Sequence, residues 1–184
     1  MFFYPWRKLL TDAGDGNLFV CHIVREAKPI FDPANHLERL RASFKLRASY
    51  GRDISLASDL GWFIDRNADA LKTSVVAKRI VWCVRTILIA RTAERGAPLF
   101  APGALAATTS SSAAAELLLT RHQGRADVLM RRRFRQFLED EGHRPPLPNE
   151  ANPRDYDKHF KRTKNSVAIR TLLQGSQAIK QQYS

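Results

Sequence analysis

The stretch SVVAKRIVWCVRTILIARTAER, residues 74–95, decides the fold. Its apolar side chains recur three and four residues apart, the spacing of one face of an α-helix: Val76, Ile80, Val84, Ile87 and Leu88. Ser74 is a suitable N-cap, and Gly96 with Pro98 just beyond it is suited to end the helix. Because the stretch is apolar on most sides apart from its basic residues, we expect this helix at the centre of a bundle, with Trp82 and Ile87 largely buried.

Helical periodicity continues on both sides of this stretch. One helix is predicted over about 53–71, another from about 124 to 141, and the last helices between about 156 and 179. The Ala/Ser/Thr run at 104–115 predicts either one small-residue helix or a pair of helices whose second member starts at 110–112. No alternating strand pattern and no fixed repeat occurs. The sequence therefore predicts an all-α fold: a bundle of five to seven helices over residues 33–184 with short connections.

Residues 1–32 differ from the rest of the chain and are predicted to form a short extended appendage to the bundle. A turn cluster occupies 12–17, and the apolar positions after it predict one short amphipathic helix with Asn17 as its N-cap. The prolines Pro29 and Pro33 then favour a brief extended segment, because a residue that precedes proline is disfavoured in the helical region.

The chain is strongly basic. Its 184 residues include 30 Lys and Arg against 18 Asp and Glu, which gives a formal net charge of +12. Such an excess favours a polyanionic partner, bound through phosphate contacts. The alternative is an ordinary arginine-rich surface without a specific partner.

The densest basic run predicts a nucleic-acid contact surface. Four arginines lie within five positions, and they are the candidate residues: Arg131, Arg132, Arg133 and Arg135. The alternative is a solvated helix face that is partly neutralised by the acidic run at 139–141. On either interpretation these side chains are expected at the surface, where replacement by Gln changes folding little.

A second basic run has two aromatic residues within it. Its cations are Arg154, Lys158, Lys161, Arg162 and Lys164. Tyr156 and Phe160 could stack on bases, but their spacing of four residues also fits a pair that faces the core of the bundle.

The residue patterns of common catalytic and metal sites do not occur in the sequence. Cys21 and Cys83 stand alone, which predicts two buried thiols, no disulfide framework and a reducing, cytoplasmic location. The histidines form no metal-binding pair, and no metal or other cofactor is expected. Asp65 and Asp69 flank Arg66 on a helix of mixed charge and are expected at the surface. No membrane segment is predicted, since the most apolar stretch is short and contains basic residues.

The segment GNLFVCHIVREAKPIFD, residues 16–32, resembles the end of the catalytic domain in small bacterial nucleotidyltransferase-domain proteins. The segments RTILIAR at 85–91 and GAPLFAP at 96–102 are similar to the helical, HEPN-type domain that accompanies those enzymes. The resemblance covers about residues 10–105. It implies that 1–32 corresponds to the end of a nucleotidyltransferase domain and that the bundle is the domain that follows it.

Two departures from the family bear on activity. The Gly-Ser turn and paired aspartates that hold Mg²⁺ in these enzymes do not precede Gly16, so the chain is expected to begin after the catalytic module. Ribonucleases of the HEPN group have a histidine four to six residues after an arginine, and here Arg91 follows Arg85 at that place.

The resemblance thus implies a non-catalytic accessory module that binds a partner protein, a nucleotide or RNA. Arg85 and Arg91 are its candidate ligand-binding residues, or else the polar edge of a buried helix. The alternative is a truncated or split nucleotidyltransferase, or a HEPN-like ribonuclease.

Overall fold

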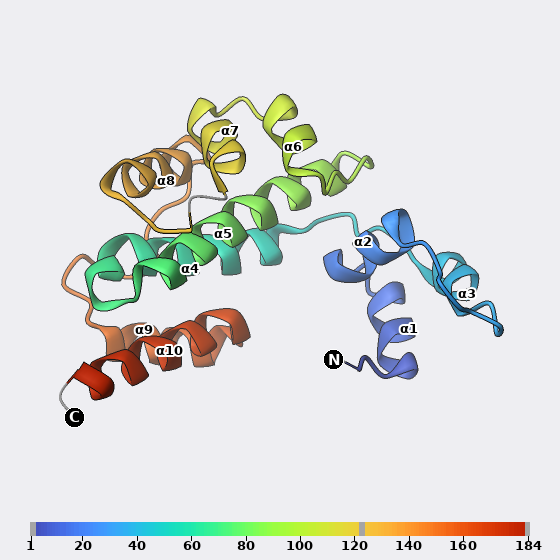
Figure 1. The fold of residues 1–184 in the computed structure, drawn as a ribbon, viewed down its shortest axis with the longest axis horizontal. Helices are drawn as coiled ribbons and strands as arrows, with labels where there is room; N and C mark the ends of the chain where they lie inside the picture. The colour runs from blue at the N-terminus through green and yellow to red at the C-terminus, as the bar shows by residue number, and fades with distance from the viewer. Residues whose placement is uncertain (1–2, 122–123, 183–184) are drawn as a thin grey trace. The chain divides into compact units, whose positions relative to one another are not determined.

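The computed structural model describes residues 3–121 and 124–182, with side chains as far as Gln174. All regular structure in these ranges is helical, with ten α-helices and one 3₁₀ helix (Figure 1). In chain order the elements are α1 Trp6–Gly14, α2 Leu18–Glu26, α3 His36–Ser43, α4 Gly51–Asn67, η1 Ala68–Ala70, α5 Thr73–Glu94, α6 Pro102–Thr108, α7 Ser112–Leu119, α8 Val128–Asp140, α9 Pro153–Thr163 and α10 Ser166–Gln182.

The all-α class predicted from the sequence is confirmed, but the ten α-helices of the described ranges exceed the five to seven predicted. Five of them have nine residues or fewer: α1, α2, α3, α6 and α7. Such helices span barely two turns, so few apolar positions repeat within them and the helical period is hard to see in the sequence.

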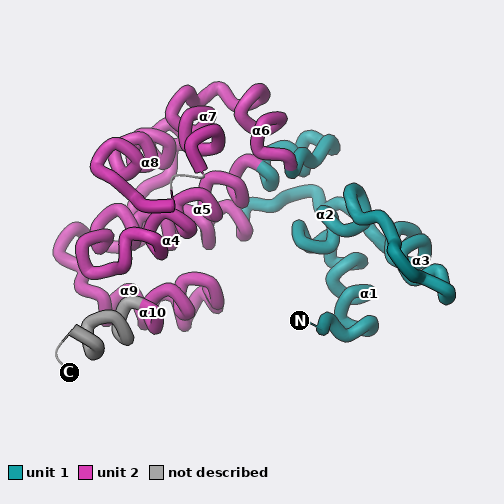
Figure 2. Tube along the Cα trace, in the orientation of Figure 1, with its two compact units in different colours: residues 1–51, 89–100 teal, residues 52–88, 101–184 magenta. Residues whose placement is uncertain are grey.

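The chain divides into two compact units (Figure 2). Unit 1 comprises Met1–Gly51 and Ile89–Phe100, and unit 2 comprises Arg52–Leu88 and Ala101–Ser184. Helix α5 belongs to both, because its residues as far as Leu88 lie in unit 2 and its last residues lie in unit 1.

Unit 1 is built on a small apolar core shared by α1, α2 and α3, which contact one another. Four of its residues are fully or almost fully buried: Ala13, Val20, Val24 and Leu40. Asn17 is the N-cap of α2 as predicted, and its side chain accepts a hydrogen bond of 2.8 Å from the backbone N–H of Phe19. The appendage expected to be extended apart from this helix therefore contains two helices, since α1 begins at Trp6 and runs into the turn cluster predicted at 12–17.

The turn between α1 and α2 requires a glycine. Gly16 has a φ of 62°, in the left-handed region, and a Cβ there would lie 2.6 Å from the carbonyl oxygen of Lys45.

Asp32 stabilises the start of α3. Its carboxylate accepts hydrogen bonds from the backbone N–H groups of Leu37 and His36. These two bonds hold the pKa of Asp32 below its ordinary value.

The end of α5 is tied to the end of the N-terminal segment within unit 1. The carboxylate of Glu94 accepts hydrogen bonds from the backbone N–H of Tyr50 at 2.7 Å and from the hydroxyl of Ser49 at 3.2 Å. Tyr50 is fully buried. This contact joins positions 44 and 45 residues apart in the sequence.

In unit 2, α4 packs between α8 and α9. Gly61 of α4 lies so close to α8 that a Cβ there would be 3.0–3.2 Å from the side chains of Phe134 and Leu138. On the other side, Phe63 packs against Tyr156 and Phe160 of α9, with ring centroids 5.1 and 5.7 Å apart. These two contacts fix which residues of α4 face each neighbour.

The helices predicted over 53–71 and 74–95 are confirmed as α4 with η1 and as α5, with boundaries shifted by a few residues. Ile87 is fully buried and Trp82 is mostly buried, as predicted, although Trp82 keeps some contact with solvent. The Ala/Ser/Thr run forms a helix pair, α6 and α7, and the Ser111 hydroxyl caps α7 by accepting from the backbone N–H of Ala114.

None of the helices that the structure describes combines the length and the apolar character needed to cross a membrane.

Candidate functional site

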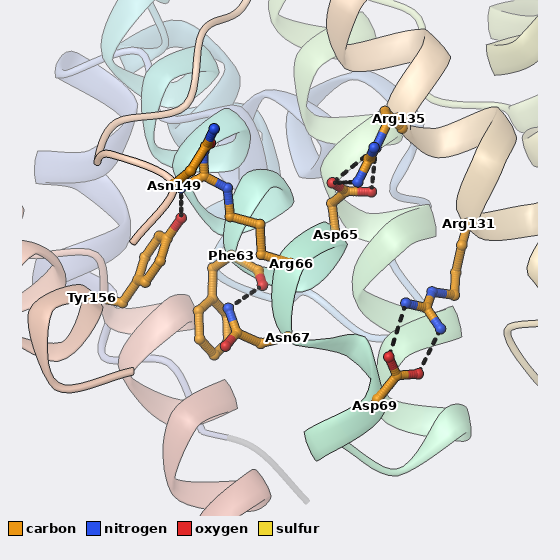
Figure 3. A network of polar contacts seen from close by, with 9 residues as sticks. All are labelled: Phe63, Asp65, Arg66, Asn67, Asp69, Arg131, Arg135, Asn149 and Tyr156. Atoms are coloured by element: carbon orange, nitrogen blue, oxygen red, sulfur yellow. Dashed lines mark hydrogen bonds and ion pairs between the residues drawn. The ribbon is translucent and has the colours of Figure 1, made fainter. Parts of the chain in front are cut away.

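Three of the four candidate arginines on α8 are held in ion pairs with acids of other helices. Arg131 contacts Asp69 of η1 at 2.7 Å, and Arg133 contacts Glu116 of α7. Arg135 binds Asp65 of α4 (Figure 3). The direct partners of these three arginines are thus acids of other helices, and not the acidic run at 139–141.

The pair between Arg135 and Asp65 is the most extensive of the three. The Nε of Arg135 lies 3.1 Å from both carboxylate oxygens, and one Nη lies 2.7 Å from Oδ2. The Asp65 side chain is only 6% exposed, while that of Arg135 is 56% exposed. The hydrogen bonds and the charge of Asp65 raise the pKa of Arg135 above its ordinary value.

Two expectations about these charges need correction. Asp65 was expected at the surface and is buried, whereas Asp69 is 87% exposed as expected. Arg135 was expected to be replaceable without effect on folding, but it is the partner of a buried carboxylate. Arg132 does fit the expectation, since it is exposed and forms no ion pair with a described residue.

Arg66 anchors the segment that follows α8. Its guanidinium donates hydrogen bonds to the carbonyl oxygens of Leu147 and Pro148, at 3.0 and 2.8 Å. It also donates to the Tyr156 hydroxyl at 3.1 Å and to the Asn149 side chain at 2.7 Å (Figure 3). All four acceptors are neutral groups, and Arg66 forms no ion pair with an acid in the described part of the chain.

A cleft of about 730 Å³ lies among α4, α8 and the segment after α8. Its lining is polar for the most part and comprises Trp62, Asp65, Arg66, Asn67, Arg135, Glu139, His143, Arg144, Pro145, Asn149 and Ala151. Its volume falls within the range of small-molecule sites, about 300–1,000 Å³. No sequence pattern predicts this cleft, because its residues come from segments about 70 to 90 positions apart with no shared motif.

The second basic run is on α9, and its aromatic residues face inward. Tyr156 and Phe160 are both fully buried, so they are core residues and cannot stack on bases. Five cations of the run are exposed: Arg154, Lys158, Lys161, Arg162 and Lys164. Lys161 alone among them forms an ion pair with a described acid, Asp157, and the two side chains of that pair are 65% and 38% exposed.

Arg85 and Arg91 do not form a pair on one face. They lie six residues apart on α5, and at about 100° per residue they point to sides of the helix about 120° apart. Both are half-buried, and Arg91 contacts Glu94 at 3.6 Å. Arg85 belongs to unit 2 and Arg91 to unit 1.

A histidine that the sequence analysis set aside is buried in a polar contact. The Nε2 of His159 lies 2.6 Å from Asp59, and its Nδ1 lies 3.2 Å from an Nη of Arg162. Because an arginine can only donate, Nδ1 accepts and the proton is on Nε2, facing the carboxylate. Both ring nitrogens therefore have hydrogen-bond partners within unit 2. No group of three or more metal-ligating side chains occurs within the described ranges.

No protein-family model, no curated protein and no solved structure matches this chain.

Proposed function

We propose that the chain is a non-catalytic helical module that binds RNA through the exposed cations of α9. The resemblance to the helical domains of nucleotidyltransferase-type proteins implies an accessory module that binds a partner protein, a nucleotide or RNA, and RNA is the partner that we propose. The observation that carries it is the contrast between the two basic helices: three arginines of α8 are paired with acids from other helices, whereas most cations of α9 are exposed without an acid partner.

The spacing on α9 supports a continuous contact with a phosphate backbone. Arg154, Lys158 and Lys161 follow one another at intervals of four and three residues, which places them on one face of the helix. Lys164 continues the run at the C-terminal cap. The buried aromatic residues on the opposite face fix the helix to the core, so the charged face is presented on a rigid element.

The same comparison makes α8 the weaker surface. A phosphate that approaches Arg131 or Arg135 also approaches the carboxylate bound to it, and that repulsion offsets part of the attraction. Arg132 is free of this effect and is expected to contribute about one phosphate contact.

Because Tyr156 and Phe160 are buried, recognition is expected to be electrostatic, with little base stacking. Binding should therefore depend weakly on sequence and steeply on salt concentration.

The test is a salt titration of the affinity for single-stranded RNA. A variant carrying Arg154→Gln, Lys158→Gln and Lys164→Gln should bind unrelated RNA sequences more weakly, and the slope of log K against log salt should fall by roughly 0.7 per lost contact. The matched control is a triple variant that also loses three positive charges, through Lys72→Gln, Lys78→Gln and Arg125→Gln. These three side chains are also exposed.

The proposal requires the control to keep the wild-type slope. Equal losses in the two variants would show that net charge, and not α9, governs binding. An RNA affinity that is undetectable at low salt would also refute it.

A further inference from the structure

The cleft in unit 2 offers a second kind of site, separate from the exposed face of α9. It is lined by side chains from α4, α8 and residues 143–151, and none of the exposed cations of α9 belongs to its lining. What it binds can be inferred from the charges that its lining leaves uncompensated.

Arg135 enters the cleft in a fixed orientation. Asp65 holds its Nε and one Nη through three contacts of 2.7–3.1 Å, which leaves the other Nη as a donor. The Arg135 side chain is 56% exposed even in this pair. A guanidinium held in this way loses little conformational freedom when it binds a ligand.

The remaining lining carries more positive than negative charge. Asp65 is neutralised by Arg135, while Arg66 has only neutral acceptors around it. Arg144 is exposed and forms no ion pair with any residue in the described ranges, and Glu139 is the one further acid of the lining. The balance favours an anion.

The lining also offers hydrogen-bond donors from several residues. The Asn149 side-chain oxygen accepts from Arg66, so its amide nitrogen remains a donor. The free Nη of Arg135, the fork of Arg144 and this amide come from three different residues. Three separate donors suit an anion with three oxygens around one centre better than a planar carboxylate, which a single arginine fork can satisfy.

We propose that this cleft binds a small organic phosphate. The phosphate lies against Arg144, Asn149 and the free Nη of Arg135, and the charges of Arg144 and Arg66 offset the repulsion from Asp65 and Glu139. A cleft of about 730 Å³ is far larger than a phosphate group, and the organic part lies against the apolar surfaces of Trp62, Pro145 and Ala151. This site is independent of the RNA surface.

The test is calorimetric titration of the full chain with AMP as a simple phosphate monoester. Adenosine is the uncharged counterpart, and malate is the carboxylate comparison. Saturable 1:1 binding is expected for AMP, and no such binding is expected for adenosine or malate. Arg144→Gln should weaken it about tenfold, the effect of losing one charge-assisted contact, and should not affect folding because Arg144 is exposed and unpaired within the described ranges.

Two controls separate this site from the RNA surface. Arg125→Gln removes an equally exposed arginine outside the cleft and should leave AMP binding unchanged. The triple variant of α9 should also bind AMP normally, while Arg144→Gln should bind RNA normally. AMP binding that survives in Arg144→Gln, equal binding of adenosine or malate, or no AMP binding at all would overturn the proposal.

Discussion

Replacing different arginines of α8 should lower the free energy of unfolding by very different amounts, although these residues are close neighbours with the same side chain. Replacing Arg135 by Gln leaves the carboxylate of Asp65, which is 6% exposed, without its ionic partner. Removing one partner of a fully buried pair costs about 3–5 kcal/mol, whereas solvated pairs contribute about 0–1 kcal/mol. Here one end is buried and the other is 56% exposed, so we expect Arg135→Gln to lower the free energy of unfolding by about 2 kcal/mol.

Arg131→Gln is the matched control. Its partner Asp69 is 87% exposed, so water solvates the carboxylate when the arginine is lost. The expected cost is below about 0.5 kcal/mol. Arg132→Gln, which breaks no described ion pair, should cost no more than that.

Urea unfolding monitored by circular dichroism measures all three variants. The double variant Arg135→Gln with Asp65→Asn should recover part of the loss, because removing both charges leaves no unpaired carboxylate. Equal costs for Arg131→Gln and Arg135→Gln would refute the reasoning, since partner burial would then have no effect. An additive double variant would show that the two side chains do not interact.

Other parts of the fold give further predictions. Cys21 and Cys83 are buried and burial raises the pKa of both thiols, so neither should react with a thiol reagent in the native protein and both should react in denaturant. Arg66→Lys should lower the free energy of unfolding by about 1–3 kcal/mol and speed hydrogen exchange over residues 147–151, because an ammonium cannot reach all four acceptors. The pKa of Asp32, followed by NMR titration, should lie below its ordinary value. Its stabilisation of α3 should be complete above the ordinary pKa and be lost as the pH falls through the folded-state value, a dependence that Asp32→Asn should abolish.

The features that could be predicted from the sequence are those that depend on residues close together in the chain. The period of 74–95 predicted α5, and the capping residues Asn17 and Ser111 stand where α2 and α7 begin. The spacing of Tyr156 and Phe160 also allowed the core pair that the structure shows. Each of these signals acts within about one or two helical turns.

The charge pairing could not be predicted, because it depends on packing between distant segments. Arg131 and Arg135 meet acids 62 and 70 positions away, and no local pattern marks those acids. Asp65 looks like a surface residue in sequence, since Arg66 is beside it and Asp69 is one turn further on. It is buried because α8 packs closely against α4 at Gly61, which brings Arg135 within reach.

Helix α5 contributes residues to both units, and this limits how the units can be separated by cleavage or by recombination. Unit 1 includes the last turn and a half of a helix whose earlier part belongs to unit 2, and Glu94 in that part holds the backbone of Tyr50. No single cut in the chain therefore releases unit 1 whole. A recombination event that moved unit 1 into another gene would need further junctions beyond the one after Gly51, and one of them would fall inside a continuous helix. In evolution, gene duplication, loss or exchange is therefore expected to involve both units together.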